Sequence, residues 1–420
     1  MGLPDLVDLD EIVSIAKDLV RIPSFKGEEQ GVARWIVAWL KERGFETELQ
    51  EVEPGRYNGI GRLRGTGGGQ TLMFNGHMDI DPLARDWRRD PWTPVVEGDR
   101  LYAAGISNMK AGIASFLGAV SAIVRSGERF AGDLLVAGVV GELQGGVGTK
   151  FLTEHGPRPD AALVAEPYGA DNIVTVHTGW GQAALHILGS SRHIGEKESA
   201  VDAIKGAMKA IAALDAIEFT YEPRPDLPGI PRLLVGNIRG GLGRQYDLNG
   251  PNYVSDFATM IIDLRFNHSQ SITSVEADLR RTLDAVAAAD PSFRYELEFP
   301  APKQFNVCYV VHPPYELRAG GYILDSTLKA YREVTGHEPA VAGGAILPDA
   351  PSASPASTSY AADDTSHLMA AGIPCLLYGP GGYYDQPVSP DTYTKLSEME
   401  QVAKVYTLVA KDICSRAADA

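Results

Sequence analysis

Three short apolar segments of this chain each lead into a polar residue, and this repeated pattern constrains the fold more than any other feature. The segments are 71–74, 133–140 and 161–164, and the polar residues that follow them are His77 and Asp79, Glu142, and Glu166. Open α/β sheets place their functional side chains at the carboxyl ends of neighbouring strands. The sequence therefore predicts an α/β domain in which these residues meet at one edge of a sheet.

The first of these strand ends also carries a chemical signal. His77 can bind a metal ion through one ring nitrogen, and the carboxylate of Asp79 can hold the other N–H and so fix the tautomer. Taken alone, a His-x-Asp pair is more often an ordinary strand end than a metal site. Both interpretations stay open until the rest of the chain is considered.

Segments with helical periodicity surround the predicted strands. The expected helices are 10–20, 32–40, 111–125, 321–334 and 397–416, and a further strand is expected at 374–378. The middle of the chain differs, because it predicts strands at 182–188, 233–238, 257–266 and 293–299 and helices at 201–214 and 274–288. This βαββαβ order is that of a ferredoxin-like domain. We expect a catalytic domain formed by 1–181 and 314–420, interrupted by an inserted domain at 182–313.

Length and composition agree with two domains and narrow the partners. The chain has 420 residues, more than one hydrophobic core usually organises. Its formal net charge of −16 argues against nucleic acid and membrane surfaces as partners. Cys308, Cys375 and Cys414 lack the spacing of a disulfide framework or a cysteine metal site. The N-terminus lacks a signal-peptide pattern, so we expect a cytoplasmic protein that acts on a small molecule.

Several motifs, taken in order, resemble the family of co-catalytic metallopeptidases that includes aminoacylase, succinyl-diaminopimelate desuccinylase and bacterial glutamate carboxypeptidase. They are Gly76-His77-Met78-Asp79, the segment 101–112, Glu142 with Gly145-Gly146-Val147-Gly148, Ala165-Glu166-Pro167, Arg192-His193, Ala371-Gly372-Ile373-Pro374 and Gly379-Pro380-Gly381. The resemblance implies a zinc-exopeptidase-like, three-layer α/β catalytic domain with an inserted ferredoxin-like lid and dimerisation domain.

The resemblance also implies a ligand set, from which this chain departs. In the family two ions share a bridging Asp, and the first Glu of a Glu-Glu pair is the general base. Carried over by position, His77 and Glu166 are ligands of one ion and Glu142 is the base. Asn108 stands where the bridging Asp is expected, Leu143 replaces the second Glu, and Val388 replaces a late His.

These departures share one consequence. Leu and Val cannot bind a metal, and an amide bridges two dications far less well than a carboxylate. All three lost functions belong to the second ion or to the bridge, and losing two carboxylate charges with one dication leaves the formal charge of the site unchanged. We therefore expect one divalent ion, Mn or Zn, held by His77, Asn108 and Glu166. The alternatives are a second ion held by unrecognised ligands, and a non-catalytic relative.

Three residues of the inserted domain complete the predicted site. His193 matches a family histidine that stabilises the oxyanion in the neighbouring subunit, which implies a homodimer or larger homo-oligomer. Arg192 and Arg265 are candidates for binding a substrate carboxylate, although either can equally belong to a structural ion pair.

The expected activity is hydrolysis of a C–N bond in a small carboxylate substrate. Water bound to a single ion becomes more acidic, and Glu142 can accept its proton. One divergent branch of the family deaminates a nitroaromatic amine, 5-nitroanthranilate, to 5-nitrosalicylate and ammonia, and the altered metal motifs resemble that branch. The alternatives are an amidohydrolase or peptidase of N-acyl amino acids or dipeptides, and a binding protein on the same scaffold.

Overall fold

The chain forms two compact units in the computed structural model, which describes residues 2–83, 85–247, 252–317, 321–343, 361–384 and 391–418. The first unit is Met1–His177 with Tyr315–Ala420, and the second is Thr178–Pro314. The sequence-based boundaries, after residues 181 and 313, lie close to these divisions. Each unit is described below by itself.

The first unit is built on a long mixed sheet. Its helices are η1 (Leu3–Leu6), α1 (Leu9–Val20), α2 (Gln30–Lys41), η2 (Ile106–Lys110), α3 (Ala111–Ser126), η3 (Glu142–Gln144), α4 (Val147–His155), α7 (Tyr322–Thr335), α8 (Thr365–Ala370) and α9 (Leu396–Cys414). Its main-sheet strands are β1 (Glu46–Glu53), β2 (Arg56–Leu63), β3 (Leu72–His77), β6 (Leu134–Val139), β7 (Ala161–Val164), β8 (Asn172–His177), β13 (Tyr315–Glu316), β14 (Ala340–Gly343) and β15 (Cys375–Leu377). A smaller sheet contains β4 (Val95–Glu97), β5 (Arg100–Tyr102), β16 (Tyr383–Tyr384) and β17 (Thr392–Lys395).

The order of the main sheet explains why the predicted polar residues come together. The strands run β1-β2-β6-β3-β7-β15-β8-β13, with β14 paired to β8. β3 lies between β6 and β7 and is parallel to both. The carboxyl ends of these three central strands therefore meet at one edge, as the sequence predicts.

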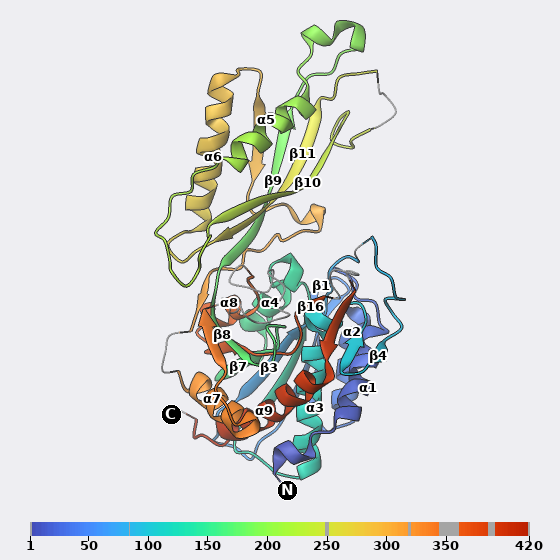
Figure 1. Cartoon of the computed structure of the whole chain (residues 1–420), viewed down its shortest axis with the longest axis vertical. Coiled ribbons are helices and arrows are strands. Elements are labelled where there is room, and N and C mark those ends of the chain that lie inside the picture. Colours follow the sequence, from blue (N-terminus) through green and yellow to red (C-terminus); the bar gives the residue numbers. More distant parts are fainter. Residues whose placement is uncertain are drawn as a thin grey trace. The chain divides into compact units, whose positions relative to one another are not determined.

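Helices cover both faces of this sheet (Figure 1). On one face the Phe74 ring packs against Phe116 of α3 and Tyr406 of α9, with ring centroids 6.0 and 5.0 Å apart. On the other face Met73 belongs to a buried cluster with Leu152 of α4 and Leu368 of α8. Neighbouring residues of a strand point to opposite faces, so Met73 and Phe74 show a sheet buried on both sides. The predicted three-layer α/β architecture is confirmed.

The second unit has the predicted ferredoxin-like order. Its elements are β9 (Gly179–Leu188), η4 (Ile194–Ser199), α5 (Ala203–Asp215), β10 (Arg232–Gly241), β11 (Phe257–Phe266), α6 (Ile272–Ala289), β12 (Arg294–Glu298) and η5 (Lys303–Phe305). The four strands form an antiparallel sheet in the order β10-β11-β9-β12, which leaves β10 at one edge. Apolar residues of α5 and α6 pack on one face of the sheet and form the core of this unit.

Among the described residues, one segment is apolar and long enough to cross a membrane by length and composition alone. It is Ile106–Ser126, which includes α3, and 94% of its most apolar window is buried inside the fold. Such burial is what a core helix shows, and α3 indeed packs between α1 and α9.

Candidate metal centre

Three adjacent strand ends bring the predicted site residues together. His77 is the last residue of β3, Glu142 opens η3 just after β6, and Glu166 follows β7. All three side chains are buried. Their positions follow directly from the parallel order of β6, β3 and β7.

The imidazole of His77 is the centre of the site. Its Nε2 lies 2.9 Å from Asn108 Oδ1 and 3.5 Å from Glu166 Oε1. Its Nδ1 lies 2.8 Å from the main-chain oxygen of Asp79 and 3.6 Å from Asp79 Oδ1. The ring is thus oriented mainly by a backbone carbonyl, and Nε2 faces two oxygen atoms.

These three atoms fit the ligand set of one divalent ion. Two ligands bound at about 2.1 Å to one ion lie about 3.0–3.4 Å apart, close to the two distances observed at Nε2. Glu166 Oε1 is buried and has no hydrogen-bond partner among the described residues, so it is available as a ligand. One imidazole with carboxylate and amide oxygens suits Mn or Zn. Within the described ranges no three His, Cys, Asp or Glu side chains form a metal cluster, so the set depends on the Asn108 amide.

The Asp79 carboxylate has a role that the sequence analysis does not predict. Its Oδ1 accepts the backbone N–H of Glu142 at 3.1 Å, and its Oδ2 accepts that of Leu143 at 2.9 Å. Asp79 therefore anchors the turn that carries the predicted base, in addition to its contact with the His77 ring. Leu143, which stands where the family has a second acid, contributes its backbone N–H to this anchor.

The electrostatics of the cluster favour a bound cation. Burial raises the pKa of Glu142 well above its usual value, and burial raises that of Glu166 to about 8, with the neighbouring acids adding to both shifts. Burial lowers the pKa of His77, but the nearby Glu166 and Asp79 outweigh it, so the net shift is upward. A positive charge at Nε2 is thus stabilised by its surroundings, and a dication would supply it while leaving the imidazole neutral.

Close backbone packing fixes the Glu166 strand end. A Cβ atom on Gly112 of α3 would lie 2.2 Å from the Ala165 oxygen, and one on Gly379 would lie 2.3 Å from the same oxygen. Only glycine permits this approach at both positions. Three motifs that are far apart in the sequence therefore meet at the peptide that precedes Glu166.

The other predicted residues lie elsewhere. Val388 is outside the described residues. In the second unit, His193 is exposed, accepts the Gly195 N–H at its Nδ1 (3.2 Å) and packs edge-on against Tyr253. Arg192 is also exposed, and its guanidinium donates to the Ser191 carbonyl.

Arg265 belongs to a structural network of the second unit. Its Nε donates to Asp263 Oδ1 at 2.8 Å, and its guanidinium lies 4.5 Å from the centroid of the Trp180 ring. The Trp180 indole N–H donates to the other oxygen of Asp263 at 2.6 Å. These contacts favour the structural ion pair, one of the two roles that the sequence left open for Arg265.

Two buried acids next to the site were not recognised from the sequence. Asp363 and Asp364 precede α8 and are almost fully buried. Asp364 raises the pKa of both Glu142 and Glu166, so it belongs to the same charge cluster. Neither acid has a spacing that marks a ligand, and the only signal is an acid pair in front of the Ala371–Pro374 motif.

Comparison with known proteins assigns the family. The model described as peptidase family M20/M25/M40 matches residues 73–412. N-formyl-4-amino-5-aminomethyl-2-methylpyrimidine deformylase of Bacillus subtilis (strain 168) is 26% identical over 97% of this chain and 95% of its own. Succinyl-diaminopimelate desuccinylase of Methylobacterium sp. (strain 4-46) is 29% identical over 68% of this chain and 73% of its own.

A solved structure shows the same fold. A Bacillus subtilis protein described as a dinuclear metal binding peptidase of family M20 superposes with a TM-score of 0.62 at 15% identity, covering 96% of this chain and 98% of that one. The family model covers most of the 420 residues. The chain therefore belongs to peptidase family M20/M25/M40.

Proposed function

We propose that this protein hydrolyses the amide C–N bond of a small N-acyl compound, with one divalent ion at His77, Asn108 and Glu166 and with Glu142 as general base. The observation that carries the proposal is the convergence of Asn108 Oδ1 and Glu166 Oε1 on His77 Nε2, at 2.9 and 3.5 Å. Glu142 lies in the same buried charge cluster, because His77 and Glu166 both affect its pKa.

The roles of the chain's own residues follow from this geometry. The ion, when bound, makes a water molecule more acidic and polarises the acyl oxygen. Glu142 accepts the proton of the attacking water and passes it to the departing nitrogen. Asp79 holds the Glu142 turn through two backbone N–H groups, so the base stays fixed while its proton moves. Burial keeps bulk water away from these groups and strengthens their interactions.

The names of the relatives support amide hydrolysis over deamination. One is a deformylase and another a desuccinylase, and both names describe removal of an acyl group from nitrogen. Deamination of a nitroaromatic amine stays a prediction from the altered metal motifs. A cytoplasmic location stays a prediction from the lack of a signal-peptide pattern. A carboxylate on the substrate also stays a prediction, and of its two candidate partners, Arg192 and Arg265, the second is engaged by Asp263.

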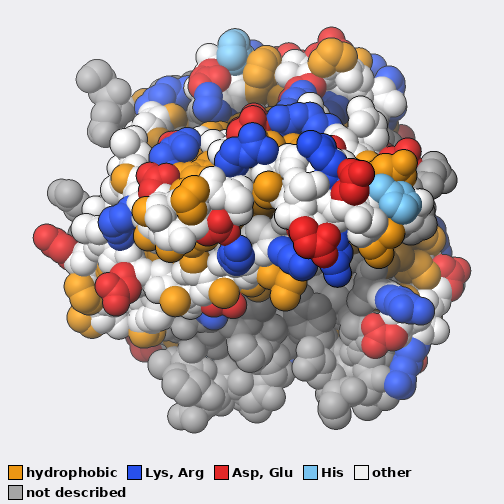
Figure 2. All heavy atoms as spheres, turned by 90° about the horizontal axis from the view of Figure 1, so that it is seen from above, with side chains coloured by type: hydrophobic (Ala, Val, Ile, Leu, Met, Phe, Trp, Pro, Cys, Tyr) orange, Lys and Arg blue, Asp and Glu red, His pale blue; other side chains and the backbone are white. Residues whose placement is uncertain are grey.

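A second copy of this chain is the partner that we propose for the second unit. β10 is an edge strand, and Leu234 and Ile238 on it are 65% and 48% exposed. The neighbouring α5 exposes Ile204 and Met208. Figure 2 shows hydrophobic side chains among Lys, Arg, Asp and Glu on the face that it presents, a mixture of both charges that can be self-complementary.

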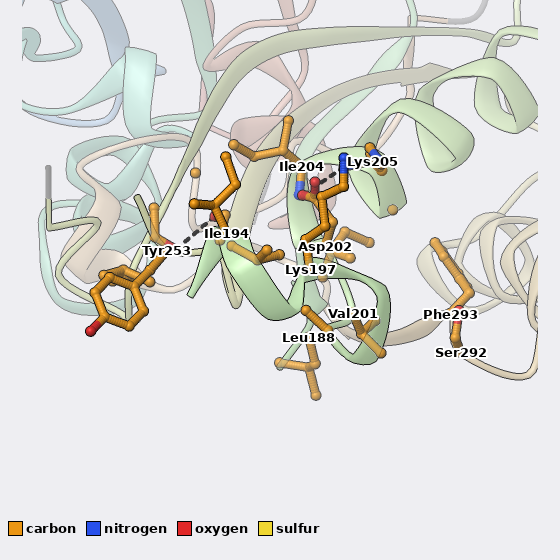
Figure 3. A pocket seen from close by; sticks show the side chains of 18 of the residues that line it. Leu188, Ile194, Lys197, Val201, Asp202, Ile204, Lys205, Tyr253, Ser292 and Phe293 are labelled. Atoms are coloured by element: carbon orange, nitrogen blue, oxygen red, sulfur yellow. Dashed lines mark hydrogen bonds between the residues drawn. The ribbon is translucent and has the colours of Figure 1, made fainter. Parts of the chain in front are cut away.

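A cavity of about 700 Å³ lies beside His193 in the second unit. Figure 3 shows Ile194, Ile204 and Tyr253 on it, together with Lys205 and Asp202. It contains none of the candidate metal ligands. Its lining supports a role in seating the second copy near His193, as the proposal that His193 acts across subunits requires.

Metal analysis and one substitution test the proposed function. The protein is stripped, loaded with Mn or Zn and assayed against N-formyl and N-acyl amines, dipeptides and nitroaryl amines. We expect about one tightly held ion per subunit and hydrolysis of an acyl amide. Glu142→Gln should retain the ion and lose turnover by about 10²–10⁴-fold, the usual contribution of a general base.

Three outcomes would contradict the proposal. Two equivalents of tightly held metal would show that a second ion is recovered. Turnover of nitroaryl amines alone would favour deamination. No turnover of any compound by the loaded protein would favour a binding protein.

A further inference from the structure

Asp363 and Asp364 are neighbours in the chain but differ in their contacts. Asp363 Oδ1 accepts the backbone N–H of Thr365 at 2.8 Å and its hydroxyl at 2.6 Å, and it lies 3.5 Å from His177 Nε2. His177 Nε2 is also 2.9 Å from the Thr365 hydroxyl. These contacts give Asp363 a structural role, because they tie the start of α8 to the end of β8.

Asp364 has no such role. It is 1% exposed, and neither of its carboxylate oxygens has a hydrogen-bond partner in the part of the chain that the structure describes. The Thr149 hydroxyl acts on this carboxylate and lowers its pKa, but it leaves both oxygens without a hydrogen bond of normal geometry. Burying a carboxylate without a donor costs several kcal/mol, so such a group needs an occupant that satisfies it.

Among the described residues, the other buried oxygens of this region that have no hydrogen-bond partner are also acceptors, and Asp363 Oδ2 is one of them. Asn75, on the same face of β3 as His77, donates its amide to the Thr149 hydroxyl at 3.1 Å, while its Oδ1 has no partner among the described residues. Glu166 Oε1 is a further acceptor of this kind. Burial raises the pKa of Asp364 to about 7, and the charges of His77, Asp363 and Asp79 also act on it, which places it within the metal-site cluster. Among the described residues, the cluster is therefore rich in acceptors, and His77 is the cation that acts on Asp364.

The buried cation Lys110 does not fill this need. Lys110 is buried near the site, but its ammonium donates to the carbonyls of Leu19 and Ile22 at 3.0 and 2.8 Å. The proposed ion accounts for Glu166, and within the described residues no three acidic, His or Cys side chains offer a second ion site. A substrate carboxylate would add a further negative charge to buried acids and would be repelled.

We infer that Asp364 binds an N–H-rich, basic group of the substrate, such as an ammonium, an amidine or an amino-substituted ring nitrogen. This inference rests on the proposed function and narrows its substrate class to N-acyl compounds that carry a basic nitrogen beside the scissile amide. A carboxylate and such a group form a charge-assisted hydrogen bond, which is stronger than a neutral one. Asp364 is thus a specificity residue, whereas Asp363 holds the surrounding frame.

A matched set of ligands tests this inference without turnover. The ligands are 4-acetamidobutylamine, N-pentylacetamide, which has a methyl in place of the ammonium, and 5-acetamidopentanoate, which has a carboxylate there. Binding to metal-loaded Glu142→Gln protein is measured by calorimetry. We expect the amine to bind at least about tenfold more tightly than the neutral and anionic compounds, a typical effect of one charge-assisted hydrogen bond.

Three further variants separate recognition by Asp364 from an effect of local charge. Asp364→Asn should abolish the preference for the amine, and Asp364→Ser serves as a second replacement if the first folds poorly. Asp363→Asn removes the neighbouring carboxylate from the same cluster and should keep the preference. The thermal midpoint of Asp364→Asn should not fall, because an unpartnered buried carboxylate is removed.

The inference fails if the amine is not preferred, or if the preference survives in both Asp364 variants. Equal loss in Asp363→Asn would show an effect of overall charge and would also overturn it. Hydrolysis of the same amides by the protein with Glu142 intact tests the proposed function separately, so failure of one leaves the other to be judged by itself.

Discussion

At the scale of single residues, this site consists mainly of buried ionisable groups that interact with partners a few ångströms away in space. His77, Asp79, Glu142 and Glu166 could be found from the sequence because each follows an apolar strand. Asp364 could not, because its significance depends on which hydrogen bonds are missing in the folded chain. The Asp79 contact with the Glu142 turn was missed for the same reason, since backbone N–H groups leave no trace in a sequence motif.

His367 of α8 gives a pH-dependent prediction at this scale. It is buried, its Nε2 lies 2.8 Å from the Gly145 oxygen, and burial lowers its pKa to about 4. An unfolded histidine titrates near pH 6.5, so below that pH the unfolded chain takes up a proton that the folded chain refuses. The contribution of His367 to stability is therefore full above about pH 6.5, and about 3 kcal/mol of it is lost as the pH drops to about 4.

Urea unfolding of wild-type and His367→Gln protein at pH 7, 5.5 and 4.5 checks this expectation. Gln can still donate to the Gly145 oxygen but does not titrate. The unfolding free energy of the wild type minus that of His367→Gln should fall steadily as the pH is lowered. A difference that is the same at all three pH values would contradict the assignment.

At the scale of elements, long and strongly periodic segments were predicted well and short ones were not. α1, α2, α3 and α9 carry amphipathic or small-residue patterns over many residues, so tertiary packing agrees with local preference. β5 and β17 have three and four residues, and they pair with each other across a large part of the chain, which no local pattern can indicate. β8 was also missed, although its residues favour strands.

The contact of α3 with the Ala165 peptide gives a prediction at this scale. Gly112→Ala places a Cβ 2.2 Å from the Ala165 oxygen, so α3 or the Glu166 strand end must move. Overpacking typically costs about 1–3 kcal/mol, which exceeds the gain of up to about 1 kcal/mol from replacing a helical glycine. We expect lower stability together with weaker metal binding, measured by thermal unfolding and by metal titration.

Gly118→Ala is the control on the same helix. Its Cβ would lie 2.3 Å from Cγ1 of the buried Ile12 in α1, which is a different contact of α3 from the one with Ala165. It should change stability and leave metal affinity as it is. Equal effects of both substitutions on metal affinity would show that the helix as a whole, and not this contact, positions Glu166.

At the scale of the whole molecule, the main prediction concerns His193. If His193 serves the neighbouring subunit, Glu142→Gln and His193→Ala proteins are each inactive, but a mixed dimer contains one site with both groups intact. Mixing equal amounts and allowing subunits to exchange should restore about one quarter of wild-type turnover for a two-fold dimer. No recovery, with exchange verified by mass spectrometry, would place His193 outside catalysis or within its own subunit's site.

The route by which the chain passes between its units has a final consequence. β8 ends at His177, β13 begins at Tyr315, and these two residues are paired directly across the two strands. The next pairing along the same two segments, Trp180 with His312, already belongs to the second unit. Residues 178–314 thus leave and re-enter the first sheet on two adjacent strands, whose paired residues lie about 5 Å apart. An insertion attached at one place in this way can become longer, be exchanged or be lost while the order of the strands in the first sheet stays the same.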